Sequence, residues 1–281
     1  MRFVRYTAGG PPEWGIDCNG SIQRLSGLPG EPPELDDLSN ESYLAAVERR
    51  LNRDQFPTID KDKITLLAPV PIPGKIVCVG LNYHDHAAEQ DETAPKAPLL
   101  FGKAPTAVTD PESPIVHPGD DEQVDYEVEL GVVIATQARH VSAEDATNYI
   151  AGYTIVNDIS GRTAQEDDGQ FLRGKSYDTF APMGPALVPD RTLDPEALDV
   201  RLRVNGDTKQ SSNTKELIFS VKELIEYISK HMTLRTGDVI STGTPGGVGI
   251  FQNPPDLLES GDTVEAEIEG IGVLRNYVVA E

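Results

Sequence analysis

Cysteine is scarce in this sequence and long apolar runs are absent. Cys18 and Cys78 are the only cysteines among 281 residues, and they lie far apart in the chain. This count argues against a disulfide framework and favours a reducing compartment, with Cys78 as a buried thiol in the apolar run KIVCVGL. No window reaches the ~18–20 apolar residues of a membrane span, and the N-terminal segment MRFVRYTAGG lacks the apolar stretch of a signal peptide. We therefore expect a cytoplasmic protein with no membrane partner.

Basic residues are also few. The chain has 24 lysines and arginines against 46 acidic residues, which gives a net charge of −22. This imbalance disfavours nucleic acids and anionic membranes as partners. Because the carboxylates are scattered along the whole chain, we interpret most of them as a solubilising surface, with a functional acidic patch as the alternative.

Glycine and proline, in contrast, are frequent, with 25 and 22 residues. This composition is typical of a β-rich fold with many turns and argues against a helical bundle. A proline-rich stretch, APVPIPGK, marks a boundary after a small N-terminal domain of residues 1–70. In that domain we expect a strand in MRFVRYT, a hairpin around Asn19-Gly20, a proline-rich connection at residues 29–33, and a helix in ESYLAAVERRL capped by Ser39 or Asn40.

Residues 71–281 form the expected main domain, in which strands outnumber helices. The clearest helix is SVKELIEYISKHM, which begins with a serine–glutamate capping box, and a second helix start is indicated at Ser142. Hairpins are predicted at Asn205-Gly206 and within residues 262–279. The overall pattern predicts an α+β fold that is mostly β. The predicted strands are KIVCVGL, whose continuous apolar run indicates burial, QVDYEVELGVVI (123–134), GYTIVND (152–158) and the start of DVISTGTPGGVG (238–249), which runs into a glycine-rich loop.

The strand VDYEVELGVV carries the strongest chemical signal. Side chains alternate along a strand, so Asp125, Glu127 and Glu129 share one face. If that face is buried among the apolar neighbours, like charges are costly unless a cation lies between them, and carboxylate oxygens suit Mg²⁺, Mn²⁺ or Ca²⁺. Asp158, at the end of the strand GYTIVND, can complete a three-carboxylate site. The alternatives are a solvent-exposed acidic face for the glutamates and helix capping for Asp158.

The segment LNYHDHAAE offers a possible base. His86 and Glu89 are three residues apart and therefore share a face of a helical turn. A carboxylate that orients an imidazole makes it a general base able to activate water. The alternative is an ordinary polar loop, and His84 is a nearby competitor.

A basic side chain and two polar ones complete the candidate set. Lys175 is flanked by a glycine and a serine in RGKSYDTFAPMGP, which indicates a fixed position, although a lone lysine usually lies on the surface. Arg162 and Gln165, in SGRTAQEDD, can face the same pocket from a short helix. The loop TGTPGGVG (242–249) matches no phosphate-binding or dinucleotide pattern, but its backbone amides can hold a carboxylate.

Taken together, these segments resemble the fumarylacetoacetate hydrolase family over residues 71–281. The resemblance implies a β-rich catalytic fold, usually a homodimer, with Mg²⁺ or Mn²⁺ as cofactor, and it likens residues 1–70 to the variable N-terminal region of longer members. The segments that carry it, in the order of the family, are IVCVGLNYHDHAAE, PLLFGKAPTAV, VDYEVELGVVI, GYTIVNDIS, GKSYDTFAPMGP and STGTPGGVG.

The resemblance also implies roles for individual residues. By matching positions, Glu127, Glu129 and Asp158 are metal ligands. The implied catalytic residues are His86, its acidic partner Glu89, Lys175, and Gln165, which positions substrate or water. The implied substrate-binding residues are Arg162, Thr244 and Tyr83, the last in the motif Asn-Tyr-x-x-His.

The expected activity is metal-dependent hydrolysis of a carbon–carbon bond in a small 2,4-dioxo acid, an acylpyruvate or diketo-deoxy sugar acid. Pyruvate or a derivative and a second carboxylic acid would be the products, with water activated by His86. Decarboxylation of oxaloacetate or isomerisation of a dioxo acid on the same metal site is the alternative. A catalytically silent metal- or metabolite-binding protein is the alternative of another class.

Overall fold

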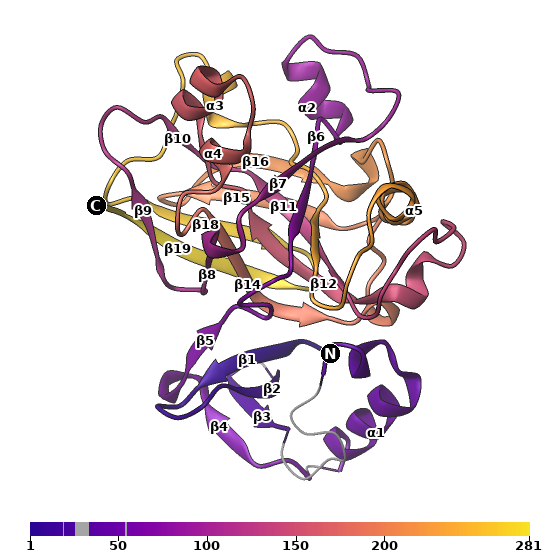
Figure 1. Ribbon diagram of the computed structural model, residues 1–281. Helices are drawn as coiled ribbons and strands as arrows, with labels where there is room; N and C mark the ends of the chain where they lie inside the picture. The colour runs from indigo at the N-terminus through magenta and orange to yellow at the C-terminus, as the bar shows by residue number, and fades with distance from the viewer. Residues whose placement is uncertain (19, 26–33, 54) are drawn as a thin grey trace.

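The computed structural model describes residues 1–18, 20–25, 34–53 and 55–281. Within these residues the strands form three sheets (Figure 1). The largest sheet has twelve strands and runs from the N-terminal segment into the main body, the second has five strands, and the third is a ribbon of two. The helices are short, and the strand-rich architecture confirms the predicted α+β, mostly β fold class.

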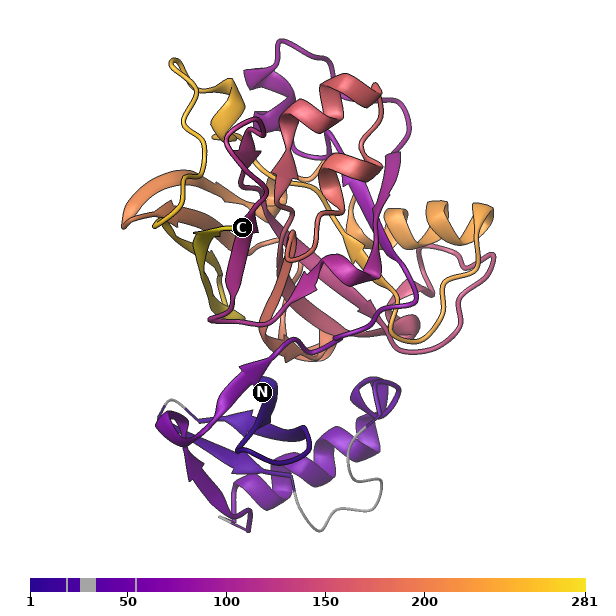
Figure 2. The ribbon, with the colours of Figure 1, turned by 60° about the vertical axis from the view of Figure 1, so that its left-hand side comes forward.

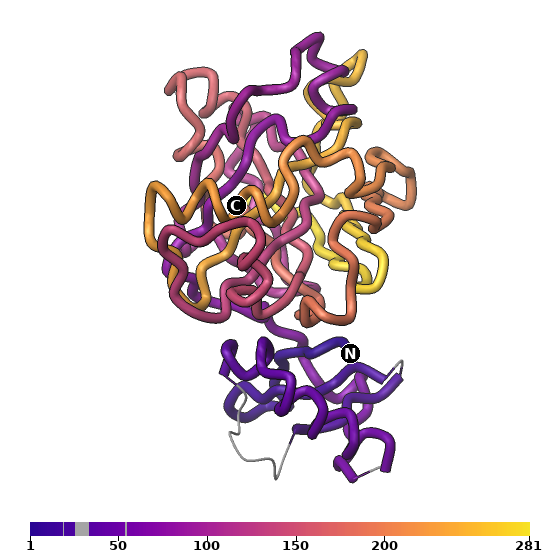
Figure 3. Tube along the Cα trace, turned by 90° about the vertical axis from the view of Figure 1, so that its right-hand side faces the viewer, coloured from indigo at the N-terminus to yellow at the C-terminus, as the bar shows by residue number. Residues whose placement is uncertain are grey.

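The N-terminal strands gather into a small unit that lies below the main body in Figures 1 to 3. Asn40 caps its helix by accepting hydrogen bonds from the amides of Ser42 and Tyr43, so the second of the two predicted caps is the one used. The predicted hairpin is present as the β2–β3 pair, whereas Asn19 and residues 29–33 lie outside the described residues. The elements of this unit are β1 (Phe3–Thr7), β2 (Glu13–Asp17), β3 (Ser21–Arg24), α1 (Glu41–Leu51), β4 (Thr58–Asp60) and β5 (Thr65–Leu67).

One sheet connects this unit to the main body. Phe3 of β1 pairs with Leu187 of β14 (Ala181–Val188), and the strand order continues through β12, β11 and β17 to β6 and β7. The remaining strands are β6 (Ile76–Gly80), β7 (Leu99–Lys103), β8 (Val108–Thr109), β9 (Pro114–His117), β10 (Val124–Asp125), β11 (Val128–Ile134), β12 (Ile150–Asn157), β13 (Ser160–Gly161), β15 (Asp199–Val204), β16 (Asp207–Asn213), β17 (Val239–Ser241), β18 (Thr263–Ile268) and β19 (Gly272–Ala280).

Helices cover the main body at two places. Three short helices gather at the end opposite the N-terminal unit, and α5 lies on one flank (Figures 1 and 2). The capping box of α5 is confirmed, since Ser220 and Glu223 bond each other's backbone amides. The four helices are α2 (His84–Glu89), α3 (Arg162–Asp168), α4 (Leu172–Lys175) and α5 (Val221–His231).

Strands β11 and β12 form the centre of the core and are buried along their whole length. Leu130 of β11 shares one apolar cluster with Leu202 of β15 and Val264 of β18, so the five-stranded sheet packs against the central strands. Each such side chain contributes roughly 1.5–3 kcal/mol when it is fully buried. The thiol of Cys78 is buried as predicted. This rigid core supports the polar residues at the strand ends.

Two local predictions need correction. The expected strand 123–134 is interrupted, because β10 pairs with β13 whereas β11 begins only at Val128. The helix expected from Ser142 is a short 3₁₀ turn over Ala146–Tyr149. Ser142 and Asp145 bond each other, with 2.8 Å from hydroxyl to carboxylate, and such local side-chain bonds compete with helix formation. The predicted hairpins at Asn205-Gly206 and in residues 262–279 are confirmed.

Candidate metal centre and active site

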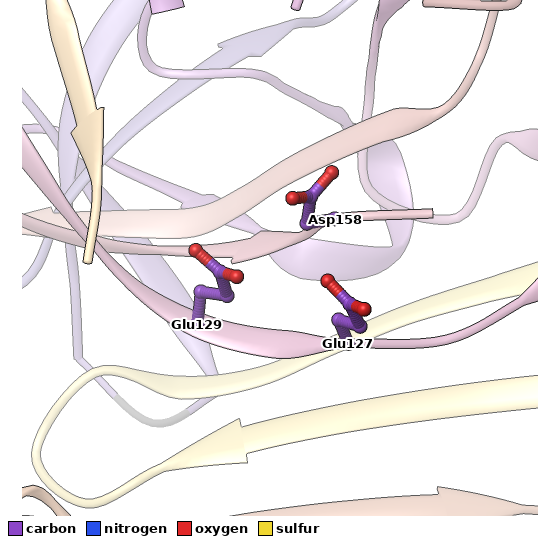
Figure 4. A group of neighbouring side chains, drawn as sticks. All are labelled: Glu127, Glu129 and Asp158. Atoms are coloured by element: carbon purple, nitrogen blue, oxygen red, sulfur yellow. The ribbon is translucent and has the colours of Figure 1, made fainter. Parts of the chain in front are cut away.

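The register of β11 and β12 brings three acidic side chains together. Val128 pairs with Asn157, and the amide of Asp158 donates to the carbonyl of Glu127 at 2.8 Å, so the residue after β12 lies beside the residue before β11. Glu127 and Glu129 are two positions apart and project from the same face. One carboxylate oxygen from each of Glu127, Glu129 and Asp158, the carboxylate triad, lies within 4.8 Å of the others (Figure 4). All three side chains are buried.

Two buried lysines lie against the carboxylate triad. Nζ of Lys175 in α4 donates to Oε2 of Glu127 at 2.6 Å and to Oδ2 of Asp158 at 2.8 Å. Nζ of Lys103, the last residue of β7, donates to Oδ1 of Asp158 at 2.5 Å and to a backbone carbonyl at 2.9 Å. Lys175 therefore has the fixed position that its flanking residues indicate. Lys103 is not among the residues predicted from the sequence, and the structure adds it to the site.

Arg162, the first residue of α3, bridges Asp125 and Glu127. Its Nη2 donates to Oδ2 of Asp125 at 2.9 Å and to Oε1 of Glu127 at 2.6 Å, while Nη1 donates to the amide oxygen of Gln165 at 3.1 Å. Asp125 and Glu127 therefore point to the same side, as the alternation predicts, and Arg162 binds both. Because its guanidinium is occupied by the protein's own carboxylates, Arg162 is suited to holding Glu127 in place, and its predicted contact with substrate stays a prediction.

The charges at the site leave one carboxylate without a counterion. The triad and the neighbouring aspartate present four carboxylates, and the two lysines and the arginine present three cations. Burial would raise the pKa of Glu127, but Lys175 and Arg162 outweigh it and hold this pKa at about 2. Burial, together with the charges of Asp158 and Glu127, raises the pKa of Glu129 to about 8. Glu129 makes no salt bridge within the described part of the chain.

This donor set fits a hard divalent cation. Carboxylate oxygens are the ligands that Mg²⁺ and Mn²⁺ take in octahedral sites, and three of them leave positions open for water or a bound acid. A divalent cation would offset the negative charge that Glu129 takes on when it loses its proton. The triad is therefore chemically suited to the predicted Mg²⁺ or Mn²⁺.

His86 and Glu89 lie one turn apart on α2 and form the predicted pair. Nδ1 of His86 is 2.6 Å from Oε1 of Glu89, and Nε2 is 2.9 Å from the amide nitrogen of Gln90. These partners assign the ring proton to Nδ1, so the Nε2 lone pair is the basic position, and in this structure it accepts from the amide of Gln90, which substrate must displace. His86 lines the same cavity as Glu127 and Glu129, so the base and two of the three triad carboxylates face one space.

The glycine-rich loop after β17 holds the acidic residues of the site. The sequence predicts that the backbone amides of this loop can hold a carboxylate. In the structure, these amides bind carboxylates of the protein's own side chains. Gly247 has a φ of +100°, and a Cβ there would lie 2.2 Å from the carbonyl oxygen of Lys209, so this position requires glycine. The amides of Gly243, Gly246, Gly247 and Gly249 donate to Glu129, Asp85, Glu89 and Asp125 at 2.9, 3.2, 2.8 and 2.9 Å, respectively.

The remaining predicted residues differ in their access to the cavity, which has a volume of about 390 Å³. Gln165 and Thr244 line it. The Thr244 hydroxyl donates to the carbonyl of Val128 at 3.1 Å and accepts from Gln210 at 2.8 Å, so its proton is already used. Tyr83 is fully buried and is not part of the lining, and burial raises its pKa. The predicted contacts of Thr244 and Tyr83 with substrate stay predictions.

Known proteins resemble this chain in sequence and in structure. Mitochondrial oxaloacetate tautomerase FAHD2A of Bos taurus is 46% identical, with 99% of this chain and 92% of that protein covered. A 5-carboxymethyl-2-hydroxymuconate delta-isomerase from Mycobacterium smegmatis has a TM-score of 0.80 at 35% identity, covering 100% and 99% of the two chains. A maleylpyruvate hydrolase from Sphingobium sp. SYK-6, solved with manganese(II) and pyruvate, has a TM-score of 0.81 at 30% identity, covering 100% and 99%.

The fold and the buried triad define a class of strand-rich proteins built around an acidic metal site. Residues 75–279 match the family described as fumarylacetoacetate (FAA) hydrolase, C-terminal. The chain therefore belongs to the fumarylacetoacetate hydrolase family, as its motifs predict. Within the described residues, none of the helices has the length and apolar character that crossing a membrane requires.

Proposed function

We propose that this protein catalyses the metal-dependent interconversion of the enol and keto forms of a small 2-oxo acid of the oxaloacetate type. The observation that carries the proposal is that His86, which is bonded to Glu89, lines one cavity together with Glu127 and Glu129 of the carboxylate triad. Support comes from the 46% identical relative that is named an oxaloacetate tautomerase. This reaction is closer to the alternative drawn from the sequence than to the hydrolysis expected first.

A divalent cation held by the triad would supply an electrophile that stabilises negative charge on the enolate oxygen. The chain's own residues supply the proton transfer. Nε2 of His86 removes a proton from C3 of the keto acid and delivers it to the C2 oxygen, and the reverse path gives the keto form. Glu89, 2.6 Å from Nδ1, fixes the ring and stabilises the imidazolium that forms.

Lys175 orients two carboxylates of the triad and adds positive charge beside them. Lys175 bonds two members of the triad and is buried, so its ammonium group is fixed close to the place where the enolate charge develops. Burial alone would lower its pKa, but the charges of Asp158 and Glu127 outweigh burial and raise it, so Lys175 stays protonated at neutral pH. Lys175 is therefore an electrostatic stabiliser in this mechanism and not a proton donor.

Hydrolysis of a carbon–carbon bond is the second candidate. The same histidine can deprotonate water in place of a C–H group, and the relative from Sphingobium is named a maleylpyruvate hydrolase. Decarboxylation of oxaloacetate would also pass through an enolate. The three reactions differ in their products: hydrolysis of acetylpyruvate releases acetate and pyruvate, decarboxylation releases carbon dioxide and pyruvate, and tautomerisation releases neither.

The decisive experiment follows the ultraviolet absorbance of the oxaloacetate enol as it decays, with the Mg²⁺-loaded protein and with protein treated with a chelator. We expect acceleration only with metal, and a loss of rate on the order of 10²–10⁴-fold in His86→Ala. The matched control is His84→Ala, because His84 lies on the same helix but is exposed and makes no contact with the triad. Equal rates in His86→Ala and wild type would contradict the proposal. Binding of the acid without any acceleration of enol decay would identify a binding protein instead of an enzyme.

The proposal also covers the location and the oligomeric state of the protein. We propose that the protein is cytoplasmic, because its cysteines are few and Cys78 is a buried thiol. We also propose that it is a homodimer, which analytical ultracentrifugation measures directly. A purely monomeric protein with full activity would refute the second expectation.

A further inference from the structure

The cavity has a polar floor and an apolar mouth. Its buried lining residues include the glutamates of the triad and Lys175, whereas the lining residues that are exposed to solvent are mostly large and apolar. Leu99, Phe171 and Phe251 are 46%, 40% and 44% exposed, and because all three line one opening they form a local apolar surface. These residues come from the start of β7, the segment just before α4 and the loop after β17, and α2, α3 and α4 lie at the same end of the main body (Figure 1).

Aromatic contacts connect this mouth directly to the reacting groups. The ring of Phe251 lies edge-on to the imidazole of His86, with 5.9 Å between the ring centroids. The ring of Phe101 lies 5.1 Å from Nζ of Lys175 and meets Phe171 edge to face at 5.3 Å. In the proposed reaction His86 acts at C3 of the oxo acid, so a substituent on C3 would lie next to Phe251.

Among the residues that line the cavity, no cation is available to pair with a second negative charge, and the polar residues Gln90, Gln123 and Gln165 offer neutral amides alone. The cations that line the cavity, Arg162 and Lys175, are both paired with buried carboxylates. Glu166, on α3, also lines the cavity and is exposed, so it would repel an anionic tail. Oxaloacetate ends only one carbon beyond C3, which keeps its second carboxylate near the polar floor, but a longer dicarboxylic acid would extend into the apolar mouth.

We infer that, besides short acids of the oxaloacetate type, the cavity accepts 2-oxo acids with an uncharged aryl or other bulky apolar substituent on C3, and that it favours them over unsubstituted and over longer dicarboxylic 2-oxo acids. This inference rests on the proposed function and names its substrate class. The chemistry is unchanged: the C3–H bond breaks, the C2=C3 bond forms and the proton moves to the C2 oxygen, with no other reactant. A volume of about 390 Å³ lies within the range of pockets that accept ligands larger than a four-carbon acid.

The test compares binding of pyruvate, 2-oxoglutarate and phenylpyruvate to the Mg²⁺-loaded protein by calorimetry. We expect phenylpyruvate to bind tighter than either of the other acids by on the order of tenfold or more, as burial of an aromatic ring predicts. In Phe251→Ala this preference over pyruvate should fall severalfold, and Phe171→Ala serves if the first variant fails to fold. Leu172→Ala is the control, because Leu172 is 55% exposed beside Phe171 but does not line the cavity.

Charge is tested separately. Glu166→Gln should strengthen binding of 2-oxoglutarate and leave pyruvate unchanged, since only the longer acid brings an anion to the mouth. Equal affinity for the three acids, or a phenylpyruvate preference that survives both phenylalanine substitutions, would overturn the inference.

The two proposals fail in distinguishable ways. Ketonisation of oxaloacetate together with weak binding of phenylpyruvate refutes the substrate class and leaves the proposed function intact. A phenylpyruvate preference that depends on Phe251, without turnover of either enol, supports the apolar mouth and refutes the tautomerase.

Discussion

Lys103 and Asp158 form an ion pair that is closed to solvent, with 2.5 Å between Nζ and Oδ1 and no exposed side-chain surface on either partner. The other oxygen of Asp158 is bonded to Lys175. Burial lowers the pKa of Lys103, and the charge of Asp158 opposes that change. Each carboxylate oxygen of Asp158 is therefore bonded to a lysine. These bonds fix Asp158, the one member of the carboxylate triad that lies outside the segment VDYEVEL.

Replacing Lys103 should therefore destabilise the protein more without metal than with it. Lys103→Met removes one of the two cations that hold Asp158 and leaves the buried carboxylates with one more uncompensated charge, a change that costs up to about 3–5 kcal/mol. A bound divalent cation would restore part of this loss by neutralising the same carboxylate. Chemical denaturation with and without Mg²⁺ measures the difference, and an equal loss under both conditions would argue against a shared site.

The affinity for metal should depend on pH in a predictable direction. Because the pKa of Glu129 is raised to about 8, this carboxyl group carries a proton at neutral pH in the metal-free protein, and metal binding must release that proton. Affinity should then rise about tenfold per pH unit below pH 8 and level off above it. Calorimetry in buffers of different ionisation enthalpy counts the protons released, and a value of zero at pH 7 would contradict the assignment.

The same pKa has a consequence for stability. The ordinary pKa of a glutamate is 4.5, so between that pH and about 8 the folded, metal-free protein binds a proton that the unfolded chain has lost. Its free energy of unfolding should fall as the pH rises through this window, and saturating Mg²⁺ should remove the decline. Glu129→Gln should abolish it as well. Thermal unfolding across this range provides the measurement.

Asp85 should position the helix that carries the base. One of its oxygens accepts from the amide of Gly246 at 3.2 Å, and the other accepts from the hydroxyl of Ser212 at 2.5 Å, which ties α2 to the glycine-rich loop and to β16. Asp85→Ala should lower kcat on the order of tenfold or more, with Mg²⁺ affinity unchanged, because it loosens the base and not the triad. Ser212→Ala should also lower kcat, but by a smaller factor, because Asp85 keeps its bond to Gly246. A parallel loss of metal affinity would assign Asp85 a purely structural role.

Gly247 offers a second way to disturb the same helix. Its amide holds Glu89 at 2.8 Å, and its backbone has a φ that side chains rarely adopt. Gly247→Ala should cost about 1–3 kcal/mol of stability and reduce turnover, since the loop must shift away from Lys209. Gly119→Ala, at a loop position with φ +123° and open space around it, controls for strain alone.

Part of the geometry of the triad was predictable from the sequence, because alternation along a strand places Glu127 and Glu129 on one face. Helical spacing likewise places His86 and Glu89 on one face of a turn. Their assignment as metal ligands and as a catalytic pair came from the resemblance to the family, because spacing alone left a solvent-exposed acidic face, a helix cap and a polar loop as alternatives. The convergence of Asp158 with the glutamates depends on the register of β11 against β12, which spacing alone cannot give.

Other features required the tertiary structure. Lys103 shares a strand face with Phe101, two positions earlier, but a single lysine at a strand end is usually solvated, so nothing local marks it as buried. The break between β10 and β11 arises from pairing with β13, a contact distant in sequence. The occupation of the loop amides by Asp85 and Glu89 likewise depends on how α2 packs.

The most direct test of the account is a titration with Mn²⁺ followed by electron paramagnetic resonance. We predict one tight site per chain in the wild-type protein and in Glu144→Gln, whose carboxyl group is exposed. The site should be lost or weakened at least a hundredfold in Glu129→Gln, an isosteric change at a buried ligand. Undiminished binding of Mn²⁺ by the Glu129→Gln protein would show that the triad is not the metal centre, and the mechanism built on it would be wrong.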